Sequence, residues 1–261
     1  MGNTPKSLIM RGPGTNCNQE TKWALELCGS EVEECHINRL MNKPDILRDY
    51  QLLAIPGGFT YGDDISAGAV LALEIRKFLG DELSAFIDSG KLVVGICNGF
   101  QVLIKSGFLP GNNLKKKTTL FFNDSAKFEC RWIYLKKNEK NNSPFLSLLP
   151  DILPCPVAHA EGKFITDESE TLKKIENSNQ VAFKYVDKSG KPGNYPVNPN
   201  GSLSDIAGIT DPTGRVLGMM PHPERSIFPN QLPDIRRDNG TGAADGLKLF
   251  EGAISYIKKN L

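Results

Sequence analysis

The sequence predicts an α/β fold: an open, mostly parallel sheet with helices on both faces and a mixed or antiparallel extension at one edge. Two observations predict it. Over residues 7–107, short apolar runs alternate with stretches whose apolar residues recur at helical spacing, as in strand–helix–strand crossovers. Over residues 118–220, apolar runs follow one another with few helical stretches between them. No Gly/Ser-rich or Pro-rich linker divides the chain, so we expect residues 1–261 to form a single domain.

The first half of the chain supplies the parallel strands and their helices. Residues 7–11 form a short apolar run, and residues 20–29 follow with Trp23 and Leu27 at helical spacing. Gly29 suits the carboxyl end of that helix. The further elements expected here are strands over 31–37 and 50–58, a helical stretch over 66–89 broken near Gly80, a strand over 91–96, and a helix from Cys97 to Gly107.

The second half predicts strands that extend the same sheet at its edge. Two segments, residues 138–152 and 228–242, receive no role. Residues 243–259 have the pattern of a closing helix. The strands expected in this half cover residues 118–122, 127–136, 180–187 and 215–220.

Charge and hydropathy exclude several classes of protein. The formal net charge is +1, whereas nucleic-acid and membrane partners usually require a basic excess, so we expect neither. The lysine runs at 115–117 and 136–137 are expected to be solvated. Neither a signal peptide nor a run of about 18 apolar residues is present, and the protein is predicted to be cytoplasmic.

The cysteines give no sign of a metal centre or a redox pair. No Cys-x-x-Cys spacing occurs, so we expect no metal in this chain and reduced, mostly buried thiols. The six cysteines stand at positions 17, 28, 35, 97, 130 and 155.

One cysteine occupies a position typical of a nucleophile. Gly95-x-Cys97-x-Gly99 follows an expected strand and precedes an expected helix, and small residues two positions away allow the tight turn of a nucleophile elbow. A helix amino terminus also favours the thiolate. An isolated motif of this form more often marks a buried structural cysteine, so partners are needed. Gln101 is one candidate, because its side chain leans back toward the thiol for substrate contact; a solvent-exposed glutamine is the alternative.

A base for Cys97 is expected near the end of the chain. His222 directly follows a strand, and in an extended backbone Glu224 points to the same side and fixes the imidazole tautomer. Alone, His-Pro-Glu indicates only a surface turn, but with the elbow it completes a nucleophile, base and orienting carboxylate. Of the other histidines, His36 is expected to be structural, and His159 is expected in a polar loop that could line the site.

Two backbone N–H groups are expected to form an oxyanion hole. Gly57 and Gly58 end the strand over 50–58, and glycines there let the Gly58 N–H approach a ligand together with the Asn98 N–H. The carboxyl ends of strands in such sheets lie at one edge, which brings these groups to Cys97. No P-loop motif is present, Gly12-x-Gly14 lacks the third glycine of a dinucleotide site, and Asp63-Asp64 has no companion metal ligands.

Together these motifs resemble the class I glutamine amidotransferases, which have a flavodoxin-like fold. Longer blocks are similar to one subfamily, the glutaminase subunits of phosphoribosylformylglycinamidine synthase, from about Leu8 to Phe250. The blocks that carry this similarity include IPGGFTYGDDISAG, GICNGFQVLIKSGFLP, NDSAKFECRW, AHAEGKF and IAGITDPTGRVLGMMPHPER.

The resemblance implies a role for each matching residue. Cys97 corresponds to the nucleophile, His222 to the general acid/base and Glu224 to its orienting carboxylate. Gly58 and Asn98 correspond to the oxyanion donors. The residues that correspond to glutamine-binding positions are Gly57, Gln101, Glu161 and Gly162.

The resemblance also implies a reaction and partners. Glutamine is hydrolysed through a thioester, and ammonia passes to a separate synthetase that uses ATP and Mg²⁺ to convert formylglycinamide ribonucleotide to the amidine in purine biosynthesis. This chain itself is expected to need no cofactor. It is expected to work as a stand-alone subunit beside the synthetase and, in some organisms, a small third subunit.

Other interpretations stay open from the sequence. The chain could serve another synthetase, such as those for GMP, CTP or carbamoyl phosphate, although NDSAKFECRW argues against it. Cys-elbow hydratases or peptidases lack the late His-x-Glu that His222 and Glu224 supply. A non-catalytic scaffold is disfavoured by the intact Cys97, His222 and Glu224.

Overall fold

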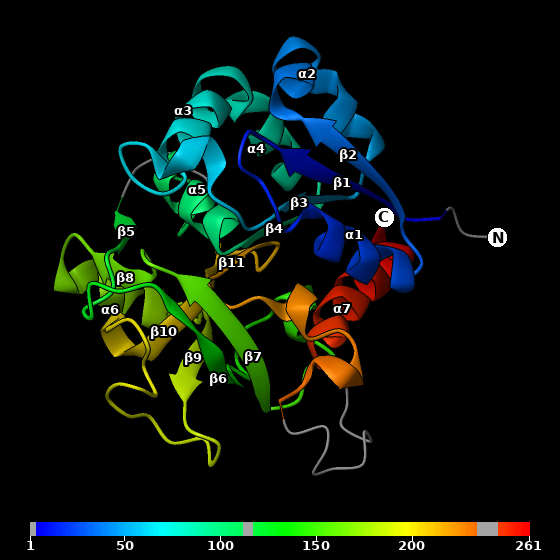
Figure 1. The fold of residues 1–261 in the computed structure, drawn as a ribbon. Helices are drawn as coiled ribbons and strands as arrows, with labels where there is room; N and C mark the ends of the chain where they lie inside the picture. Colours follow the sequence, from blue (N-terminus) through cyan, green and yellow to red (C-terminus); the bar gives the residue numbers. More distant parts are fainter. Residues whose placement is uncertain (1–3, 112–116, 234–244) are drawn as a thin grey trace.

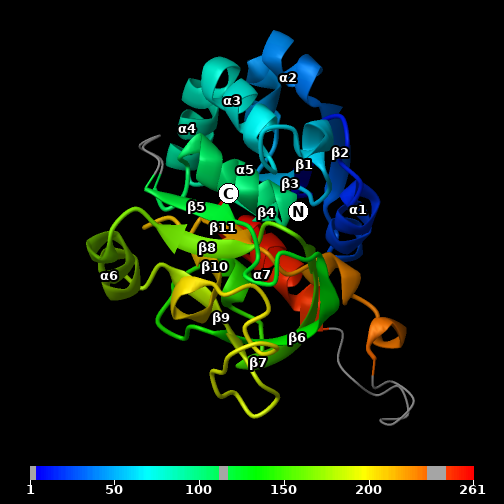
Figure 2. The same cartoon turned by 60° about the vertical axis from the view of Figure 1, so that its left-hand side comes forward.

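The computed structural model describes residues 4–111, 117–233 and 245–261 and has a nine-stranded sheet as its centre. The strand order is β2-β1-β3-β4-β11-β10-β9-β6-β7, and Figures 1 and 2 show the sheet from two directions. The predicted α/β class and mostly parallel sheet are confirmed. Part of the lysine run at 115–117 and the first residues of the helix expected over 243–259 lie outside the described residues.

The amino-terminal half forms the parallel part of the sheet. Every neighbouring pair from β2 to β11 runs parallel. Figure 1 shows α3, α4 and α5 on one side of this sheet and α1 with α7 on the other. The elements are β1 (Lys6–Arg11), α1 (Asn18–Leu27), β2 (Glu31–His36), α2 (Ile37–Asn42), β3 (Leu52–Ile55), α3 (Ala69–Phe78), α4 (Gly80–Asp88), β4 (Leu92–Ile96), α5 (Asn98–Ser106), β11 (Val216–Met219) and α7 (Asp245–Asn260).

The remaining strands extend this sheet in antiparallel fashion, as predicted. The pairs β11–β10, β10–β9, β9–β6 and β6–β7 are all antiparallel. A two-stranded sheet of β5 and β8 lies apart from the main one. The elements are β5 (Thr118–Phe121), β6 (Glu129–Lys137), β7 (Ile152–His159), β8 (Lys163–Thr166), α6 (Ser169–Asn177), β9 (Val181–Val186) and β10 (Ile206–Thr210).

Several details differ from the sequence prediction. The strand expected over 118–122 is β5, which pairs with β8 outside the main sheet. The strand expected over 215–220 is β11, which lies beside β4 at the centre and not at the edge. No strand was expected at β7, because Pro154 and Pro156 are poor strand residues. The structure accommodates them because β7 is an edge strand.

Close packing of α5 on the sheet fixes the edge where the predicted site lies. A Cβ at Gly99 would come 1.8 Å from the backbone oxygen of Ile55 at the end of β3. A Cβ at Gly95 would come 2.5 Å from the backbone oxygen of Gly99. Glycine at these positions therefore lets the start of α5 rest directly on the ends of β3 and β4.

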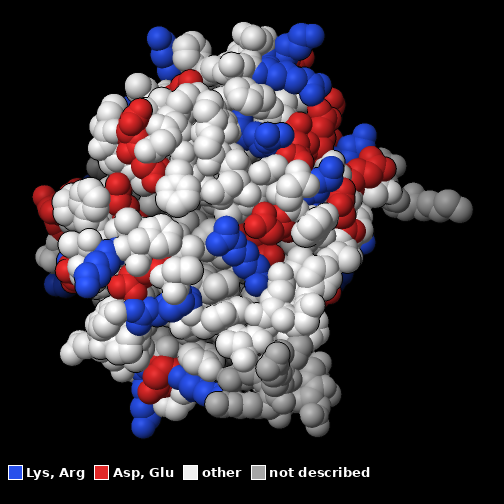
Figure 3. Space-filling view, in the orientation of Figure 1, with Lys and Arg blue, Asp and Glu red and all other residues white. Residues whose placement is uncertain are grey.

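The surface agrees with the balanced charge of the sequence. On the face seen in Figure 3, basic and acidic side chains are interspersed without a large area of one sign. No helix among the described residues combines the length and the hydropathy that a membrane-spanning segment needs.

Candidate active site

Cys97 stands in the elbow that the sequence predicts, between β4 and α5. Its backbone has φ 52° and ψ −105°, a conformation that non-glycine residues rarely adopt and that is typical of functional sites. The Cys97 N–H donates to the backbone oxygen of Met219 at 2.8 Å, which ties the elbow to the end of β11. The thiol is 5 % exposed and donates to the backbone oxygen of Ala158 at 3.6 Å.

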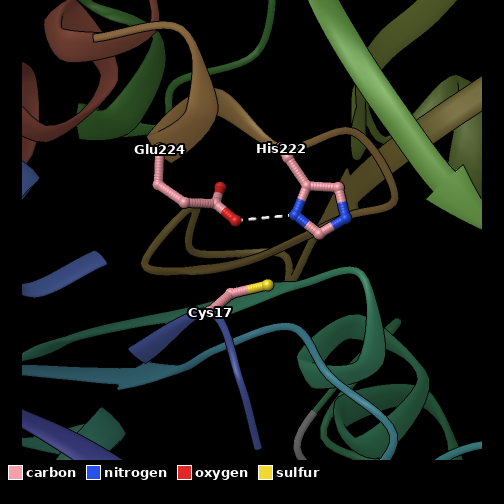
Figure 4. Close-up of side chains that lie close together, drawn as sticks. All are labelled: Cys17, His222 and Glu224. Atoms are coloured by element: carbon pink, nitrogen blue, oxygen red, sulfur yellow. Dashed lines mark hydrogen bonds and ion pairs between the residues drawn. The ribbon is translucent and has the colours of Figure 1, made fainter. Parts of the chain in front are cut away.

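His222 and Glu224 form the pair that the sequence predicts. Nδ1 of His222 lies 2.6 Å from Oε1 of Glu224, and both side chains are fully buried (Figure 4). The expectation of an extended backbone is wrong, because residues Pro223–Arg225 form a 3₁₀ turn. Proline sets the start of that turn, and the turn still brings the two side chains together. The His222 N–H is held by the backbone oxygen of Pro156 in β7 at 2.8 Å.

The charge state of His222 depends on this pairing. Burial alone lowers the pKa of the imidazole, but the carboxylate of Glu224 and a thiolate at Cys97 outweigh burial and hold the pKa well above its usual value. The second ring nitrogen, Nε2, is buried and has no hydrogen-bond partner among the described groups. It is therefore available to a reacting atom.

Gly57 lets the side chains of Cys97 and His222 approach each other. A Cβ at this position would come 2.8 Å from Cε1 of His222 and 3.5 Å from Cβ of Cys97. Both side chains thus line the space that the missing side chain leaves. The structure brings Cys97, His222 and Glu224 together from two separate parts of the chain, as predicted.

The backbone at Gly58 is oriented as an oxyanion donor requires. Thr15, after β1, and Gly58, after β3, form an antiparallel bridge, flanked by N–H···O bonds from Asn16 to Gly57 and from Phe59 to Gly14. In such a pair the N–H of Gly58 points away from Thr15, toward β4, the strand that leads to Cys97. No backbone carbonyl of the described residues accepts this N–H.

Asn98 presents its N–H at the amino terminus of α5. The first N–H groups of a helix have no partner within it and carry partial positive charge. The Asn98 side chain is fully buried and fixed, with its Oδ1 accepting from the hydroxyl of Thr60 at 2.7 Å. The roles of Gly58 and Asn98 in binding an oxyanion stay predictions, and their geometry suits them.

Gln101 lies in the wall of the site. Its Oε1 accepts from Nδ2 of Asn98 at 2.9 Å, and its Nε2 donates to the backbone oxygen of Glu161 at 2.6 Å. It is 3 % exposed, which excludes the alternative of a solvent-exposed glutamine. Contact between Gln101 and glutamine stays a prediction.

The segment at residues 158–162 closes the other side of the site. The Glu161 carboxylate accepts from the N–H of Ala67 and pairs with Lys105 at 3.5 Å. The N–H of Gly162 donates to Oδ1 of Asn123 at 3.1 Å. Substrate binding by Glu161 and Gly162 stays a prediction, because their described polar contacts are all within the protein.

His159 does not lie in a loop, contrary to the sequence prediction. It ends β7, is buried, and lies 3.1 Å from Oδ1 of Asn123. Burial lowers its pKa to about 3, so it is neutral. A Cβ at Gly162 would come 2.4 Å from its ring. The ring is thus a packed part of the wall.

Two residues near the reaction centre, Cys17 and Asp63, were given no role in the site by the sequence. The thiol of Cys17 is buried, and its sulfur lies within 4.8 Å of ligand atoms of His222 and Glu224 (Figure 4). Nη2 of Arg225 donates to that sulfur at 3.0 Å. Asp63 lies nearby and accepts from Nδ2 of Asn98 at 3.3 Å; burial, then the charge of Glu161, raises its pKa to about 6. The signal available for Cys17 was its place after β1, at the same sheet edge.

Comparison with known proteins places the chain in a family. Residues 4–257 match the CobB/CobQ-like glutamine amidotransferase domain. The chain belongs to this family. It is therefore an enzyme of the glutamine amidotransferase class. The catalytic roles of Cys97, His222 and Glu224 stay predictions.

Curated members of the family resemble the chain over nearly its whole length. The phosphoribosylformylglycinamidine synthase subunit PurQ of Dehalococcoides mccartyi is 47% identical over 256 residues, covering 97% of this chain and 98% of the relative. The protein of the same name from Treponema denticola is 42% identical over 270 residues, covering 97% and 99%.

Solved structures agree with this amidotransferase assignment. A chain of the structure of PurLQS from Thermotoga maritima has a TM-score of 0.75 and 32% identity, covering 98% of this chain and all of that one. A glutamine amidotransferase from the same organism has a TM-score of 0.57 at 12% identity and supports the fold alone.

Proposed function

We propose that this chain is the glutaminase subunit of phosphoribosylformylglycinamidine synthase. It hydrolyses glutamine and supplies ammonia to a synthetase that converts formylglycinamide ribonucleotide to the amidine in purine biosynthesis. The observation that carries the proposal is the strained elbow of Cys97 beside the buried His222–Glu224 pair. It occurs in a chain similar over almost its full length to proteins named as this subunit.

The first half of the reaction forms a thioester. The Cys97 sulfur attacks the side-chain carbonyl carbon of glutamine, and the carbonyl oxygen becomes an oxyanion that accepts from the N–H groups of Gly58 and Asn98. The intermediate collapses as the carbon–nitrogen bond breaks. His222, whose raised pKa keeps it protonated, gives its Nε2 proton to the leaving nitrogen, which departs as ammonia.

The second half releases glutamate. Neutral His222 takes a proton from water, and the resulting hydroxide attacks the thioester carbon. The same N–H groups hold the oxyanion. The carbon–sulfur bond breaks, glutamate leaves, and Cys97 with protonated His222 is restored. Glu224 stabilises the imidazolium in both halves through its 2.6 Å contact with Nδ1.

The partners follow from this division of labour. ATP and Mg²⁺ are used by the synthetase subunit, and this chain needs no cofactor for the steps above. A small third subunit completes the complex in some organisms. Relatives named as subunits of the synthase and the PurLQS structure support this assembly. We place the reaction in the cytoplasm, where purine synthesis occurs.

The decisive experiment combines the chain with a synthetase subunit and measures amidine formation from formylglycinamide ribonucleotide. With glutamine and ATP, the wild type is expected to support the reaction. Cys97→Ala is expected to lower the glutamine-dependent rate by a factor on the order of 10⁴ or more, because the nucleophile is lost. A glutamine-like diazoketone is expected to add once, at Cys97, by intact-mass analysis.

Free ammonium serves as the control. It is expected to support amidine formation by the Cys97→Ala complex, because the synthetase site is untouched. Glutamine-dependent activity retained by Cys97→Ala, or an adduct at another residue, would refute the nucleophile assignment. Failure of the wild type with every synthetase subunit tested would refute the proposed function.

A further inference from the structure

Cys17 occupies a buried position between two parts of the reaction centre. It lies in the loop that leaves the carboxyl end of β1 and immediately precedes α1. Its side chain is 1 % exposed. A Cβ at Gly57 would come 3.1 Å from its sulfur, so Cys17 borders the same small space as His222.

The backbone of this loop holds the peptide that carries the Gly58 N–H. The N–H groups of Asn16 and Cys17 both donate to the backbone oxygen of Gly57, at 3.3 and 3.1 Å. In a trans peptide the carbonyl and the following N–H point in opposite directions. Fixing the Gly57 oxygen toward Cys17 therefore fixes the Gly58 N–H toward the far side, where the oxyanion forms.

The thiol of Cys17 is engaged on its other side. Nη2 of Arg225 donates to the sulfur at 3.0 Å, and the thiol donates to Oδ1 of Asn16 at 3.2 Å. The Cys17 sulfur, a ring nitrogen of His222 and a carboxylate oxygen of Glu224 all lie within 4.8 Å of one another (Figure 4). Cys17 thus touches the arginine that follows Glu224 in sequence.

Two buried polar atoms next to Cys17 have no partner of their own. Oε2 of Glu224 and Nε2 of His222 lack a hydrogen bond to any described group. Arg225 also pairs through Nε with the partly exposed carboxylate of Glu20 in α1, at 3.8 Å. A guanidinium that lost its sulfur acceptor would keep that pair and have the buried carboxylate of Glu224 as a further acceptor. It would then compete with His222 for the carboxylate, because a charged donor gains most from a buried charged acceptor.

We propose that Cys17 is a positioning residue for glutamine hydrolysis, whose thiol keeps Arg225 away from Glu224. The inference rests on the proposed function of the site. Its consequence is that the position of the general acid depends on a thiol that does not itself react. Misplacement by about 1 Å of such groups costs on the order of 100-fold in rate.

The test compares Cys17→Ala and Cys17→Ser in the complex with the synthetase. Cys17→Ala is expected to lower kcat for glutamine by at least about 10-fold with KM changed less than about threefold. The alkaline limb of its pH–rate profile is expected to move to lower pH for two reasons. A carboxylate shared with Arg225 stabilises the imidazolium less, and the Cys17 thiol, which itself helps to raise the pKa of His222, is gone. Cys17→Ser keeps an acceptor for Arg225 and is expected to recover most of the rate and the pH profile.

Cys35→Ala is the matched control. Cys35 is equally buried, in β2, and belongs to the hydrophobic core rather than to the reaction centre. It is expected to lose stability on truncation without any change in pH profile. Ammonium-dependent amidine formation is expected to be unchanged in all three variants.

Adding Arg225→Met to Cys17→Ala tests whether the released guanidinium causes the loss. Without the competing guanidinium, the alkaline limb is expected to return toward that of the wild type. A Cys17→Ala enzyme with wild-type kcat and pH profile overturns the inference. So does a loss that Cys35→Ala reproduces. Failure of the proposed function is distinct, because the wild type would then form no amidine from glutamine.

Discussion

The backbone of Cys97 lies in a region that costs about 1–3 kcal/mol for a residue with a side chain. The structure holds it there through the Cys97 N–H bond to Met219 and the packing of Gly99 on Ile55. In this conformation the thiol is directed to the backbone oxygen of Ala158, at 3.6 Å. At the residue scale, the chemistry therefore depends on neighbours that never touch the substrate.

Glu224→Gln tests the electrostatics at this scale. Loss of the carboxylate removes the largest of the effects that oppose burial, so the pKa of His222 is expected to fall from its raised value. The glutamine-dependent kcat is expected to drop by about 10²–10⁴-fold. NMR titration of labelled imidazoles in wild type and variant measures the first effect, and steady-state kinetics measures the second.

The same pair predicts a pH dependence of stability. The folded-state pKa of His222 is raised, so its contribution is complete below about pH 6.5 and disappears as pH rises through that raised pKa. The free energy of unfolding of the wild type exceeds that of Glu224→Gln, and this difference is expected to decrease as the pH rises over that interval. Glu170→Gln, at an exposed pair with Lys174, is the control and should show no such narrowing. A gap that is constant with pH would contradict the assignment.

Sequence alone could identify Cys97, His222 and Glu224 because each lies in a motif whose spacing reflects local geometry. Cys17 could not be found this way. Its contacts with Arg225 and Gly57 join residues from three distant parts of the chain, and no local pattern records them. The sequence predicted candidate reacting groups that the structure brings together, while the groups that hold them depend on tertiary packing.

At the scale of elements, the site is assembled from strand ends and the starts of helices. The ends of β3, β4 and β11 supply Gly58, Cys97 and His222, and the loop after β1 braces them. The parallel strands β1 to β4 were predictable because their apolar runs are bounded by clear helices. The fifth, β11, was expected at the edge because few helical stretches precede it in the sequence. Strand β7 was not predictable, because its two prolines are unusual in strands. Its Pro156 oxygen accepts from the His222 N–H, and its Ala158 oxygen accepts from the Cys97 thiol.

Gly99→Ala tests the packing of α5 on β3. An added methyl would lie 1.8 Å from the Ile55 oxygen, so the helix must shift. We expect a loss of about 2–4 kcal/mol in the free energy of unfolding, measured by urea denaturation. Gly12→Ala is the control, since its nearest atoms would lie 3.9 Å away, and it is expected to change stability by less than about 1 kcal/mol. Equal effects of the two substitutions would contradict this account.

At the scale of the whole molecule, the reacting groups are enclosed. Cys97 is 5 % exposed and His222 is 2 % exposed, and the thiol is directed to a backbone oxygen while Nε2 has no described partner. We expect part of the wall to move when glutamine enters. Docking of the synthetase is expected to favour this movement, which would raise the affinity of the site for glutamine.

The isolated chain is accordingly expected to be a weak glutaminase. Addition of the synthetase subunit should raise kcat/KM for glutamine by about 5–150-fold, the range of common coupling energies. Glutamate release is measured with and without the partner at equal chain concentration, and a synthetase subunit denatured beforehand is the control. Full activity of the chain alone would show that the enclosed site opens without the partner.

The distribution of thiols has a practical consequence. Among the six cysteines, Cys130 is exposed, Cys28 is half-buried and the others are buried. Cys130 lies on β6 directly opposite Ala158, whose oxygen accepts from Cys97. A maleimide dye would attach at Cys130 and leave the nucleophile free. The label would then lie on β6, the neighbour of the strand that contacts Cys97. Its fluorescence emission would change when a partner covers this side of the protein.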